Sequence, residues 1–508
     1  MTTPDLSDKY PHVDFLNLQF TNFGKKGFFS GKIETAICPD DNSKVKQYIE
    51  NYYENIFKKI FPSPFTIAVI LTFLSVLLAL VYTGEKDLGY LSRSLTIIEY
   101  WEQGLWNAPL MVFAMQMMLM LVLGHVLALS QPINKSIQYM TAYCNNTASA
   151  AFWVCLLTLI VSLFNWGLGL IFGAIFARKV AENAGKNKWP LHYPIIGACG
   201  YSGLMVWHGG ISGSAPVKAA ESGHIQSLMT GIYNQEQLDQ LPDMLSFTDT
   251  VFSTMNLSVS IILLMTLPGM MYFIGKKSIA KDYQLNSMNI DSEPTELMGA
   301  ERLDHSKLLA GILGAGILSF AFYKSVILPE SVNLNFISPN FINFSLLGLG
   351  ILFHGNFYRF LKAIDQAISG ASGILIQFPL YFGIMGIMKH SGMIHSLSDF
   401  FVSISTETTF PIFTFISAGI VNVFVPSGGG QWAIQGPIII EASQQLGLNI
   451  SKNVMALTYG DQLTNMLQPF WALPLLGITG LKAKEILPYT LIIMLVGGII
   501  FVSGLLIF

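Results

Sequence analysis

The segment Pro411–Ser443 reads PIFTFISAGIVNVFVPSGGGQWAIQGPIIIEAS, two apolar runs separated by Asn422-Val-Phe-Val-Pro-Ser-Gly-Gly-Gly430. The proline removes a backbone donor and the three glycines permit positive φ, so one continuous helix is not expected. The segment Ser149–Val180 is interrupted in a similar way by Asn165-Trp-Gly-Leu-Gly169. Each segment is therefore predicted to form a helical hairpin, in which a helix, a tip and a second helix return the chain to the side from which it came.

The composition places both hairpins in a membrane. Hydrophobic residues make up 52% of the 508 residues, and the mean hydropathy is +0.51. Charged residues make up 12%, well below the roughly 25% of soluble domains. The net charge of −3 gives no reason to expect a nucleic acid partner, and the four cysteines have neither metal nor disulfide spacing. We therefore expect a lipid-embedded chain that binds no nucleic acid and no cofactor.

Nine other apolar runs are candidate spans, for which a helix needs about 20 residues. They are Thr66–Thr83, Pro109–Leu129, Ile195–Val217, Leu257–Ile274, Leu308–Phe322, Phe341–Phe353, Ile368–Met388, Val454–Leu476 and Ile486–Ile507. The sequence thus predicts an all-α polytopic membrane protein with about nine spans and two re-entrant hairpins. Glycine and polar residues interrupt two of these runs, Ile195–Val217 and Val454–Leu476, which are predicted to be discontinuous helices.

The distribution of basic residues orients these elements. The loops 219–250, 327–340 and 391–410 contain no Lys or Arg, whereas Arg178–Lys188 contains four such residues. Cytoplasmic loops carry the excess of basic residues, so the first hairpin is predicted to enter and leave on the cytoplasmic side and the second to enter from outside. The segment 1–61 lacks the short apolar core of a signal peptide and is predicted to be cytoplasmic.

The two halves of the chain are related by an internal repeat. The segments Ala198–Pro216 and Ala456–Pro474 share Ala, Tyr and Pro at an offset of 258 residues. The hairpin tips lie at nearly the same offset, and one extra span, Leu308–Phe322, inverts the second half relative to the first. Inverted repeats are a signature of secondary transporters. The predicted organisation is a cytoplasmic segment (1–61), a first repeat (62–276), a cytoplasmic loop with a linking span (277–326) and a second, inverted repeat (327–508).

The hairpin tips are the candidate substrate site, because non-helical backbone at membrane depth is tolerated only where protein or a water-filled cavity surrounds it. A helix that begins near Gln431 would direct its positive end at the second tip, which suits a carboxylate. No Lys or Arg lies at either tip, which favours a small monoanion. The alternative is that the glycine run only allows close helix packing. The predicted substrate-binding residues are Ser427, Gly428, Gly429, Gly430, Gln431, His208, Gly209, Ser212 and Asn465.

One acid inside a predicted span is the candidate for ion coupling. Asp461 lies in Gly460-Asp-Gln-Leu-Thr-Asn465, and an intramembrane acid is a functional hypothesis by default. The alternative is a structural acid bound by backbone amides, and His208 is either a ligand or proton carrier or a structural hydrogen-bond donor. The predicted coupling residues, for a proton or a sodium ion, are Asp461, Asn165, Gly167, Asn422 and Thr464. Four tryptophans near the breaks either wall an apolar pocket or only pack: Trp166, Trp207, Trp432 and Trp471.

Three motifs carry a family resemblance: Phe424-Val-Pro-Ser-Gly-Gly-Gly-Gln-Trp-Ala-Ile-Gln-Gly-Pro437, Tyr459-Gly-Asp-Gln-Leu-Thr-Asn465 and Trp207-His-Gly-Gly-Ile-Ser-Gly-Ser-Ala-Pro216. From about Phe61 onward the chain resembles the short-chain fatty acid transporter family, the bacterial permeases associated with acetoacetate and butyrate uptake. The resemblance implies a place in the ion transporter superfamily, with paired hairpins, broken helices, a dimeric scaffold and an elevator-like transport domain. It also implies a homodimer in the bacterial inner membrane.

Together these features predict a secondary active transporter of short-chain monocarboxylates that works by alternating access around a site between the two tips. A membrane-embedded enzyme is one alternative, but it needs a nucleophile with a nearby base, and the sequence offers only Asp461 and His208. A passive channel for small carboxylates is the other alternative. We expect a carrier without enzyme activity.

Overall fold

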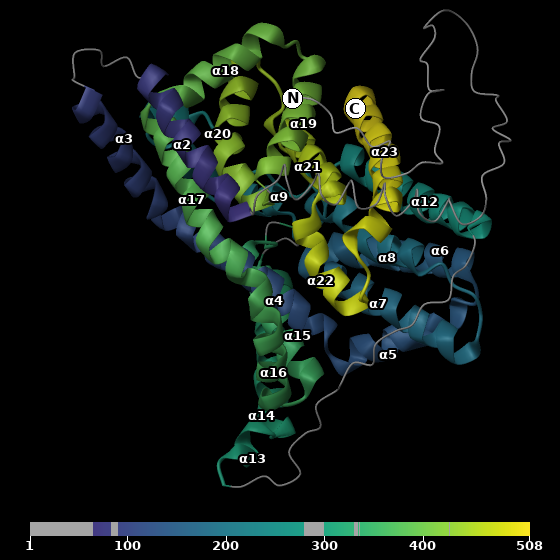
Figure 1. Ribbon diagram of the computed structural model, residues 1–508. Coiled ribbons are helices and arrows are strands. Elements are labelled where there is room, and N and C mark those ends of the chain that lie inside the picture. The colour runs from purple at the N-terminus through teal and green to yellow at the C-terminus, as the bar shows by residue number, and fades with distance from the viewer. Residues whose placement is uncertain (1–63, 83–89, 279–298, 330–333, 335, 426) are drawn as a thin grey trace, which may run out of the picture. The chain divides into compact units, whose positions relative to one another are not determined.

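The computed structural model describes the chain except for residues 1–63, 83–89, 279–298, 330–333, 335 and 426, together with the side chains of Pro64, Tyr82, Phe424, Pro469 and Phe470. The chain divides into two units, Met1–Glu54 and Asn55–Phe508, and all described residues belong to the second. Within the described residues the secondary structure is helical, with one isolated bridge and no strand (Figure 1). The all-α prediction is confirmed, whereas the predicted segment 1–61 lies outside the described residues.

The first half contains the elements α2 (Pro64–Tyr82), α3 (Tyr90–Leu105), α4 (Ala108–Ala128), α5 (Gln131–Met140), η2 (Thr141–Tyr143), α6 (Thr147–Phe164), α7 (Trp166–Asn187), α8 (Tyr193–Tyr201), η3 (Ser202–Met205), η4 (Trp207–Gly209), α9 (Ser214–Ala219), α10 (His224–Met229), α11 (Gln235–Asp239) and α12 (Thr254–Lys277). The second half contains α13 (Glu301–Asp304), α14 (Lys307–Phe322), η5 (Tyr323–Ile327), α15 (Pro339–His354), α16 (Phe357–Ala367), η6 (Ile368–Ala371), α17 (Ser372–His390), α18 (Met393–Ile404), α19 (Thr409–Phe424), α20 (Gly428–Gln445), α21 (Ile450–Thr464), η7 (Asn465–Leu467), α22 (Pro469–Thr479) and α23 (Ala483–Ile507).

Among the described residues, six helices are long and apolar enough to cross a membrane: Ala108–Ala128, Thr147–Phe164, Thr254–Lys277, Lys307–Ile327, Phe357–His390 and Ala483–Ile507. Many large apolar side chains of these helices face outward; on α14, for example, Leu308 is 71% exposed. Lipid tails solvate such side chains as well as a protein core does. The chain is therefore a multi-pass membrane protein, and the number of nine spans stays a prediction.

The two runs predicted to be discontinuous are broken. The first is divided into α8, η3, η4 and α9, and the second into α21, η7 and α22. The two breaks are joined by Tyr201, whose hydroxyl lies 2.8 Å from the carbonyl oxygen of Asn465 and 3.1 Å from that of Gln468. The broken segments therefore meet in the interior, where protein groups satisfy their freed carbonyls.

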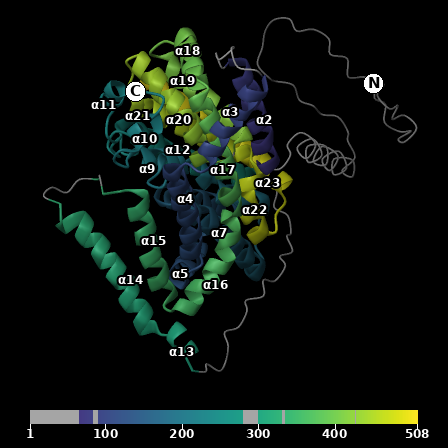
Figure 2. The same ribbon diagram turned by 90° about the vertical axis from the view of Figure 1, so that its left-hand side faces the viewer.

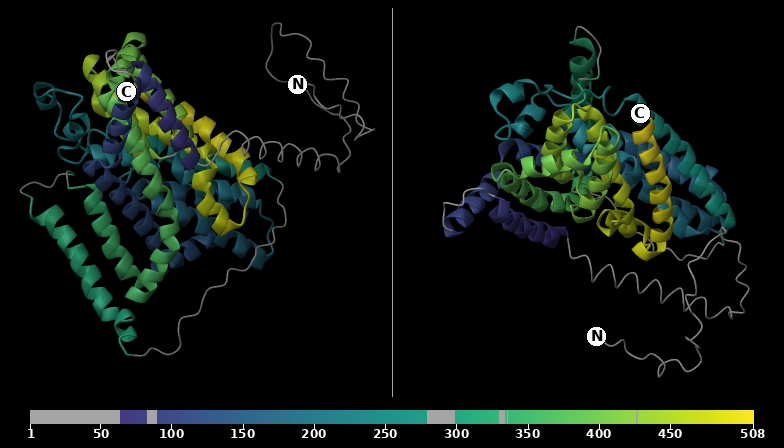
Figure 3. Two further views of the ribbon diagram at one scale, coloured as in Figure 1. Left: turned by 60° about the vertical axis from the view of Figure 1, so that its left-hand side comes forward. Right: turned by 90° about the horizontal axis from the view of Figure 1, so that it is seen from above.

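Corresponding elements of the two halves make corresponding contacts. The helix α4 packs on α7 as α17 packs on α20, and α15 packs on α4 as α2 packs on α17. The linking helix α14 packs along α15 (Figure 2), and α23 packs on α12 (Figure 3). This order of contacts agrees with two repeats, while their opposite orientation in the membrane stays a prediction.

The sequence analysis missed α3 and α16 as separate helices. In α3, which reads YLSRSLTIIEYWEQGL, polar residues are spread among the apolar ones, so no long apolar run exists. The helix α16 precedes the predicted run Ile368–Met388. It continues into α17, and together they form one helical stretch over Phe357–His390. Hydropathy alone locates helices that are apolar all round and overlooks amphipathic ones.

Candidate functional site

The helix α20 presents free backbone amides at its N-terminus. Ser427 is the N-cap, and its Oγ accepts a hydrogen bond of 3.1 Å from the amide of Gly430. Among the described residues, the amides of Gly428 and Gly429 have no acceptor. The first amides of a helix carry partial positive charge and bind anions. The start of α20 is therefore a candidate carboxylate site, and Pro426 before it lies outside the described residues.

A pocket opens at this helix end. It is lined by Met117, Trp166, Leu204, Trp207, Ser214, Gly370, Gly373, Ile374, Gln377, Phe378, Ser427, Gly428, Gly429, Asn465 and Trp471, none of which carries a charged side chain. Trp166 lies at the centre of its aromatic wall, with ring centroids 5.5 Å from Trp207 and 5.4 Å from Trp471. The pocket thus combines apolar walls with two free amides, which matches an anion that has a short apolar tail.

Close approach of side chains explains the glycine run. A Cβ atom on Gly428 would lie 2.8 Å from His208 Cε1, and one on Gly430 would lie 2.5 Å from Tyr381 Cδ2. The sequence argument that these glycines supply positive φ is wrong, because none of the three adopts it. The packing alternative accounts for Gly430, while Gly428 and Gly429 also line the pocket.

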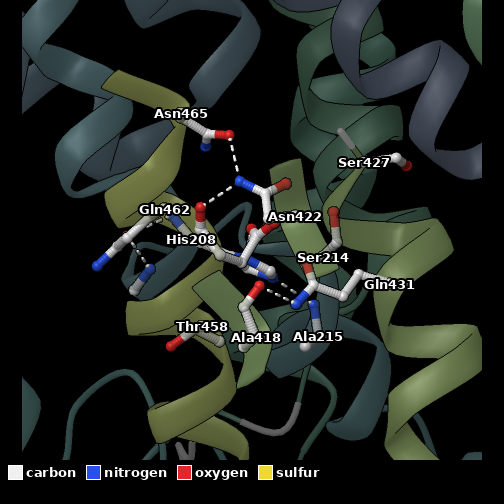
Figure 4. Close-up of polar contacts among 12 residues, drawn as sticks. His208, Ser214, Ala215, Ala418, Asn422, Ser427, Gln431, Thr458, Gln462 and Asn465 are labelled. Atoms are coloured by element: carbon white, nitrogen blue, oxygen red, sulfur yellow. Dashed lines mark hydrogen bonds and ion pairs between the residues drawn. The ribbon is translucent and has the colours of Figure 1, made fainter. Parts of the chain in front are cut away.

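A buried pair, His208 and Asp461, lies next to Gly428, since a Cβ atom on this glycine would lie 3.2 Å from Asp461 Oδ2. Figure 4 shows His208 among its polar neighbours. The amide of Ala215 donates to His208 Nε2 over 3.1 Å, so this nitrogen carries no proton. A neutral imidazole then carries its proton on Nδ1, which donates to Asp461 Oδ2. The geometry therefore favours the Nδ1–H tautomer of His208, with Asp461 Oδ2 as the acceptor.

Several buried oxygens beside this pair lack a hydrogen-bond donor among the described residues. They are Asp461 Oδ1, Asn422 Oδ1 and Gln431 Oε1. Asn422 Nδ2 donates to the Asp461 carbonyl over 2.5 Å and to Thr464 Oγ1 over 2.9 Å, which holds the broken helix to α19. Carboxylate and amide oxygens are the ligands that hard cations prefer. These oxygens are therefore candidate acceptors for a proton or a sodium ion. The described residues contain no group of three His, Cys, Asp or Glu that could hold a metal ion.

The remaining predicted residues have structural contacts. Gln431 Nε2 donates to the Ala418 carbonyl over 2.9 Å, and Ser212 Oγ accepts from the Trp166 amide over 2.9 Å. The Gly209 amide donates to Gln462 Oε1. These three predicted substrate ligands (Gln431, Ser212 and Gly209) are not among the pocket-lining residues. At the first tip, Asn165 caps α7 through the Leu168 amide, and a Cβ on Gly167 would lie 2.9 Å from the Leu121 carbonyl oxygen.

The sequence analysis missed one wall of the pocket. Gln377 and Phe378 of α17 lie within the predicted span Ile368–Met388 and were not singled out. Gln377 is a polar residue inside an apolar run, a signal that could have identified it. Phe378 gave no signal, because apolar side chains that face lipid and those that face a pocket look alike in sequence.

Comparisons with known proteins cover almost the whole chain. Residues 47–508 match the family model described as short chain fatty acid transporter. A protein of Escherichia coli K12 that carries the provisional name short-chain fatty acid transporter is 35% identical over 454 residues, which cover 88% of this chain and 96% of that protein. A stretch of 49 residues, 9% of this chain, is 49% identical to 30% of a provisionally named 4-hydroxy-4-methyl-2-oxoglutarate aldolase of Pseudomonas putida.

Solved transporter structures share the fold. MtrF of Neisseria gonorrhoeae, described among antimetabolite efflux pumps, has a TM-score of 0.54 at 11% identity, covering 88% of this chain and 95% of that one. The YdaH transporter of Alcanivorax borkumensis has a TM-score of 0.51 at 14% identity, covering 87% and 98%. These two likenesses show the fold, whereas the sequence match over almost the whole chain shows the family. The chain belongs to the short chain fatty acid transporter family.

Proposed function

We propose that this membrane transporter is a secondary active carrier that binds a short-chain monocarboxylate, such as butyrate or acetoacetate, at the start of α20. One observation carries the proposal: the free amides of Gly428 and Gly429 meet a tryptophan-lined wall in one pocket. The carboxylate would accept from the two amides, with Ser427 and Asn465 beside it, and the acyl chain would lie against Trp166. Such a division of one polar end and one apolar wall is typical of small-ligand sites.

Because the pocket has no charged side chain in its lining, it favours substrates with one carboxylate over substrates with two. Because no Lys or Arg lines the pocket, a second carboxylate on the ligand would enter without a cation to pair with it. Transfer of an unpaired charge into a dry site costs several kcal/mol. Dicarboxylates should therefore be poor substrates, whereas a neutral tail of a few carbons fits the aromatic wall.

We further propose proton coupling through Asp461. The Ala215 amide occupies Nε2 of His208, so a proton that arrives at the pair has Asp461 Oδ1 as its acceptor. A monoanion that moves with one proton crosses as a neutral unit and avoids about 2.3 kcal/mol per charge per 100 mV of membrane potential. Sodium is the alternative ion, supported by the unpartnered oxygens of Asn422 and Gln431.

The proposal includes a cytoplasmic N-terminus, which the basic-residue distribution supports. It also includes alternating access, supported by the internal repeat, and a bacterial inner-membrane location, supported by the family resemblance. Two exposed positions test the orientation: a single cysteine at Lys186 should react only from the cytoplasmic side, and one at Gln237 only from the periplasmic side. Labelling of both positions from the same side would contradict the proposed orientation. The homodimer stays an expectation from the family resemblance.

Purified protein in liposomes tests the function directly. We expect counterflow of labelled butyrate, uphill uptake under an inward pH gradient, and recovery of chemically unchanged butyrate from the lumen. Conversion of butyrate to a product would support an enzyme, and uptake that never exceeds the external concentration under either ion gradient would support a channel. Succinate in the same assay is the matched control for the preference for one carboxylate.

A further inference from the structure

A buried lysine lies close to the pocket without a part in the site described so far. Lys218, in the last turn of α9, is only 4% exposed. Its Nζ lies 2.5 Å from Glu221 Oε2 and 3.2 Å from Gln116 Oε1, and it sits over the ring of Phe113 at 5.6 Å from the centroid. A buried ammonium is costly unless it is paired, so this position requires a carboxylate partner.

Lys218 lies one helical turn beyond the pocket. Ser214, which lines the pocket, precedes Lys218 by four residues and so shares its face of α9. The facing residues on α4 repeat this spacing, since Met117 lines the pocket and Phe113 lies four residues before it. Ser214 contacts Met117 and Lys218 contacts Phe113. The two contacts form successive layers, about 6 Å apart along each helix.

Aromatic rings form the partition between the lysine and the free amides. A Cβ atom on Gly429 would lie 3.0 Å from Phe113 Cζ and 2.9 Å from Phe378 Cε2. The two rings are tilted against each other, with centroids 6.3 Å apart. Phe113 therefore touches the glycine tip with one part of its ring and carries the Lys218 ammonium over its face.

The carboxylate that pairs with Lys218 lies at the edge of the protein. The Glu221 side chain is 31% exposed, against 5% for that of Lys218. Glu221 follows the end of α9, and among the described residues its carboxylate has Lys218 as its only polar partner. Burial, with Lys218 adding to the effect, lowers the pKa of the neighbouring His224 to about 3. His224 therefore stays neutral, and Lys218 is the cation of this layer.

We propose that Lys218 is an anion-binding station between the solvent at Glu221 and the amides of Gly428 and Gly429, and that Glu221 occupies this station when substrate is absent. The inference rests on the proposed transport of monocarboxylates. An arriving carboxylate replaces the Glu221 carboxylate, which turns into water, so the lysine stays paired throughout. The substrate then passes the Phe113 ring to the glycine tip. The station thus attracts monoanions without placing a fixed cation in the pocket itself.

Saturation kinetics of butyrate counterflow in liposomes test this station. Lys218→Gln should raise KM roughly tenfold, as expected for loss of one charge-assisted hydrogen bond, with Vmax nearly unchanged. Lys218→Arg should keep the wild-type KM within a few-fold, and Glu221→Gln should lower it, because the competing carboxylate is gone. The matched control is Lys179→Gln, since Lys179 forms the same i,i+3 pair with Glu182 on α7 and should not alter KM.

A purely structural lysine gives a different result. Gln116 is also bound to Asn340 of α15 over 3.0 Å, so Lys218 could merely join α9 to α4. Lys218→Gln would then lower Vmax and the thermal stability of the protein and leave KM unchanged, which would overturn the proposal. An unchanged or raised KM in Glu221→Gln would overturn it as well. Absence of counterflow in the wild-type protein would instead contradict the transport function on which the proposal depends.

Discussion

At each hairpin tip the second helix begins with a side-chain cap, but the two tips differ in how many backbone amides they leave without an acceptor among the described residues. Asn165 caps α7 through the Leu168 amide, and Ser427 caps α20 through the Gly430 amide. At the first tip the Trp166 amide also has an acceptor, so two of the first three amides are bonded, against one of three at the second. A helix N-terminus is an anion site only where the surrounding protein leaves its amides unbonded.

The two broken segments also differ, because only the second one contains an acid at this repeat position. The repeat counterpart of Asp461 is Gly203, where a Cβ atom would lie 2.0 Å from Ser162 Oγ. The first repeat therefore has no room for an acid at this position. In the second repeat Asp461 fits beside His208 and keeps one oxygen free of donors among the described residues. The free amides and the acid thus lie in the second half, whereas the first half supplies His208 and part of the pocket wall.

We call the second tip, where the amides of Gly428 and Gly429 are free within the described part of the chain, the open tip, and the first tip at Asn165 the closed tip. The largest effect is expected from a bulky residue at the open tip. Gly429→Val must displace Phe378 and Phe113, and overpacking of about 1–3 kcal/mol corresponds to a loss of uptake of up to roughly 100-fold. Gly167→Ala is the matched change at the closed tip, where the new Cβ would lie 2.9 Å from the Leu121 carbonyl oxygen. It should lower thermal stability and leave the KM for butyrate intact. Similar uptake by the Gly429→Val protein and the wild type would return the glycine run to packing alone.

Neutralisation of the acid should have the next largest effect. Asp461→Asn removes the proposed proton acceptor, so uphill uptake driven by a pH gradient should fall at least tenfold while butyrate exchange continues, since exchange moves no net proton. Parallel loss of exchange and of sodium dependence would identify sodium as the coupling ion instead. Unchanged uphill uptake under both gradients would remove Asp461 from the mechanism.

A smaller effect is expected from removal of the Tyr201 hydroxyl, which joins the two broken helices. Tyr201→Phe removes the hydroxyl donor of the Gln468 carbonyl and one of two donors of the Asn465 carbonyl, which keeps the Gln468 amide. The loss costs about 1–3 kcal/mol and should lower the midpoint of thermal unfolding in detergent. Because Asn465 lines the pocket, uptake should also slow several-fold. Tyr193→Phe is the control: its hydroxyl bonds the Thr479 carbonyl over 3.0 Å at the end of α22, and it should affect stability alone.

Sequence reasoning succeeded where local chemistry decides the structure. Asn165 and the run that ends at Gly430 marked both tips, and the glycine and polar residues around Asp461 marked the broken helix. These signals act within a few residues, because they concern backbone donors, caps and helix breaks. The positions of both tips were therefore readable from one sequence.

Sequence reasoning failed where distant segments meet. His208 and Asp461 were each candidates, but their pairing across 253 residues follows from packing of the two broken segments. Ser212 stays a predicted substrate ligand, but its own motif did not indicate that its hydroxyl accepts from the Trp166 amide of the first tip. Which donors remain free depends on all neighbours of a residue, and a motif shows only those next to it in the chain.

The most direct test compares the two caps in one assay. Butyrate KM should be measured in liposomes for Ser427→Ala and Asn165→Ala, each of which removes a cap worth about 1 kcal/mol. The open-tip account predicts a KM raised roughly tenfold for Ser427→Ala, because the cap and a pocket wall are lost together. It predicts an unchanged KM and a lower thermal stability for Asn165→Ala. A raised KM in Asn165→Ala with a wild-type KM in Ser427→Ala would place the carboxylate at the other tip and contradict the account.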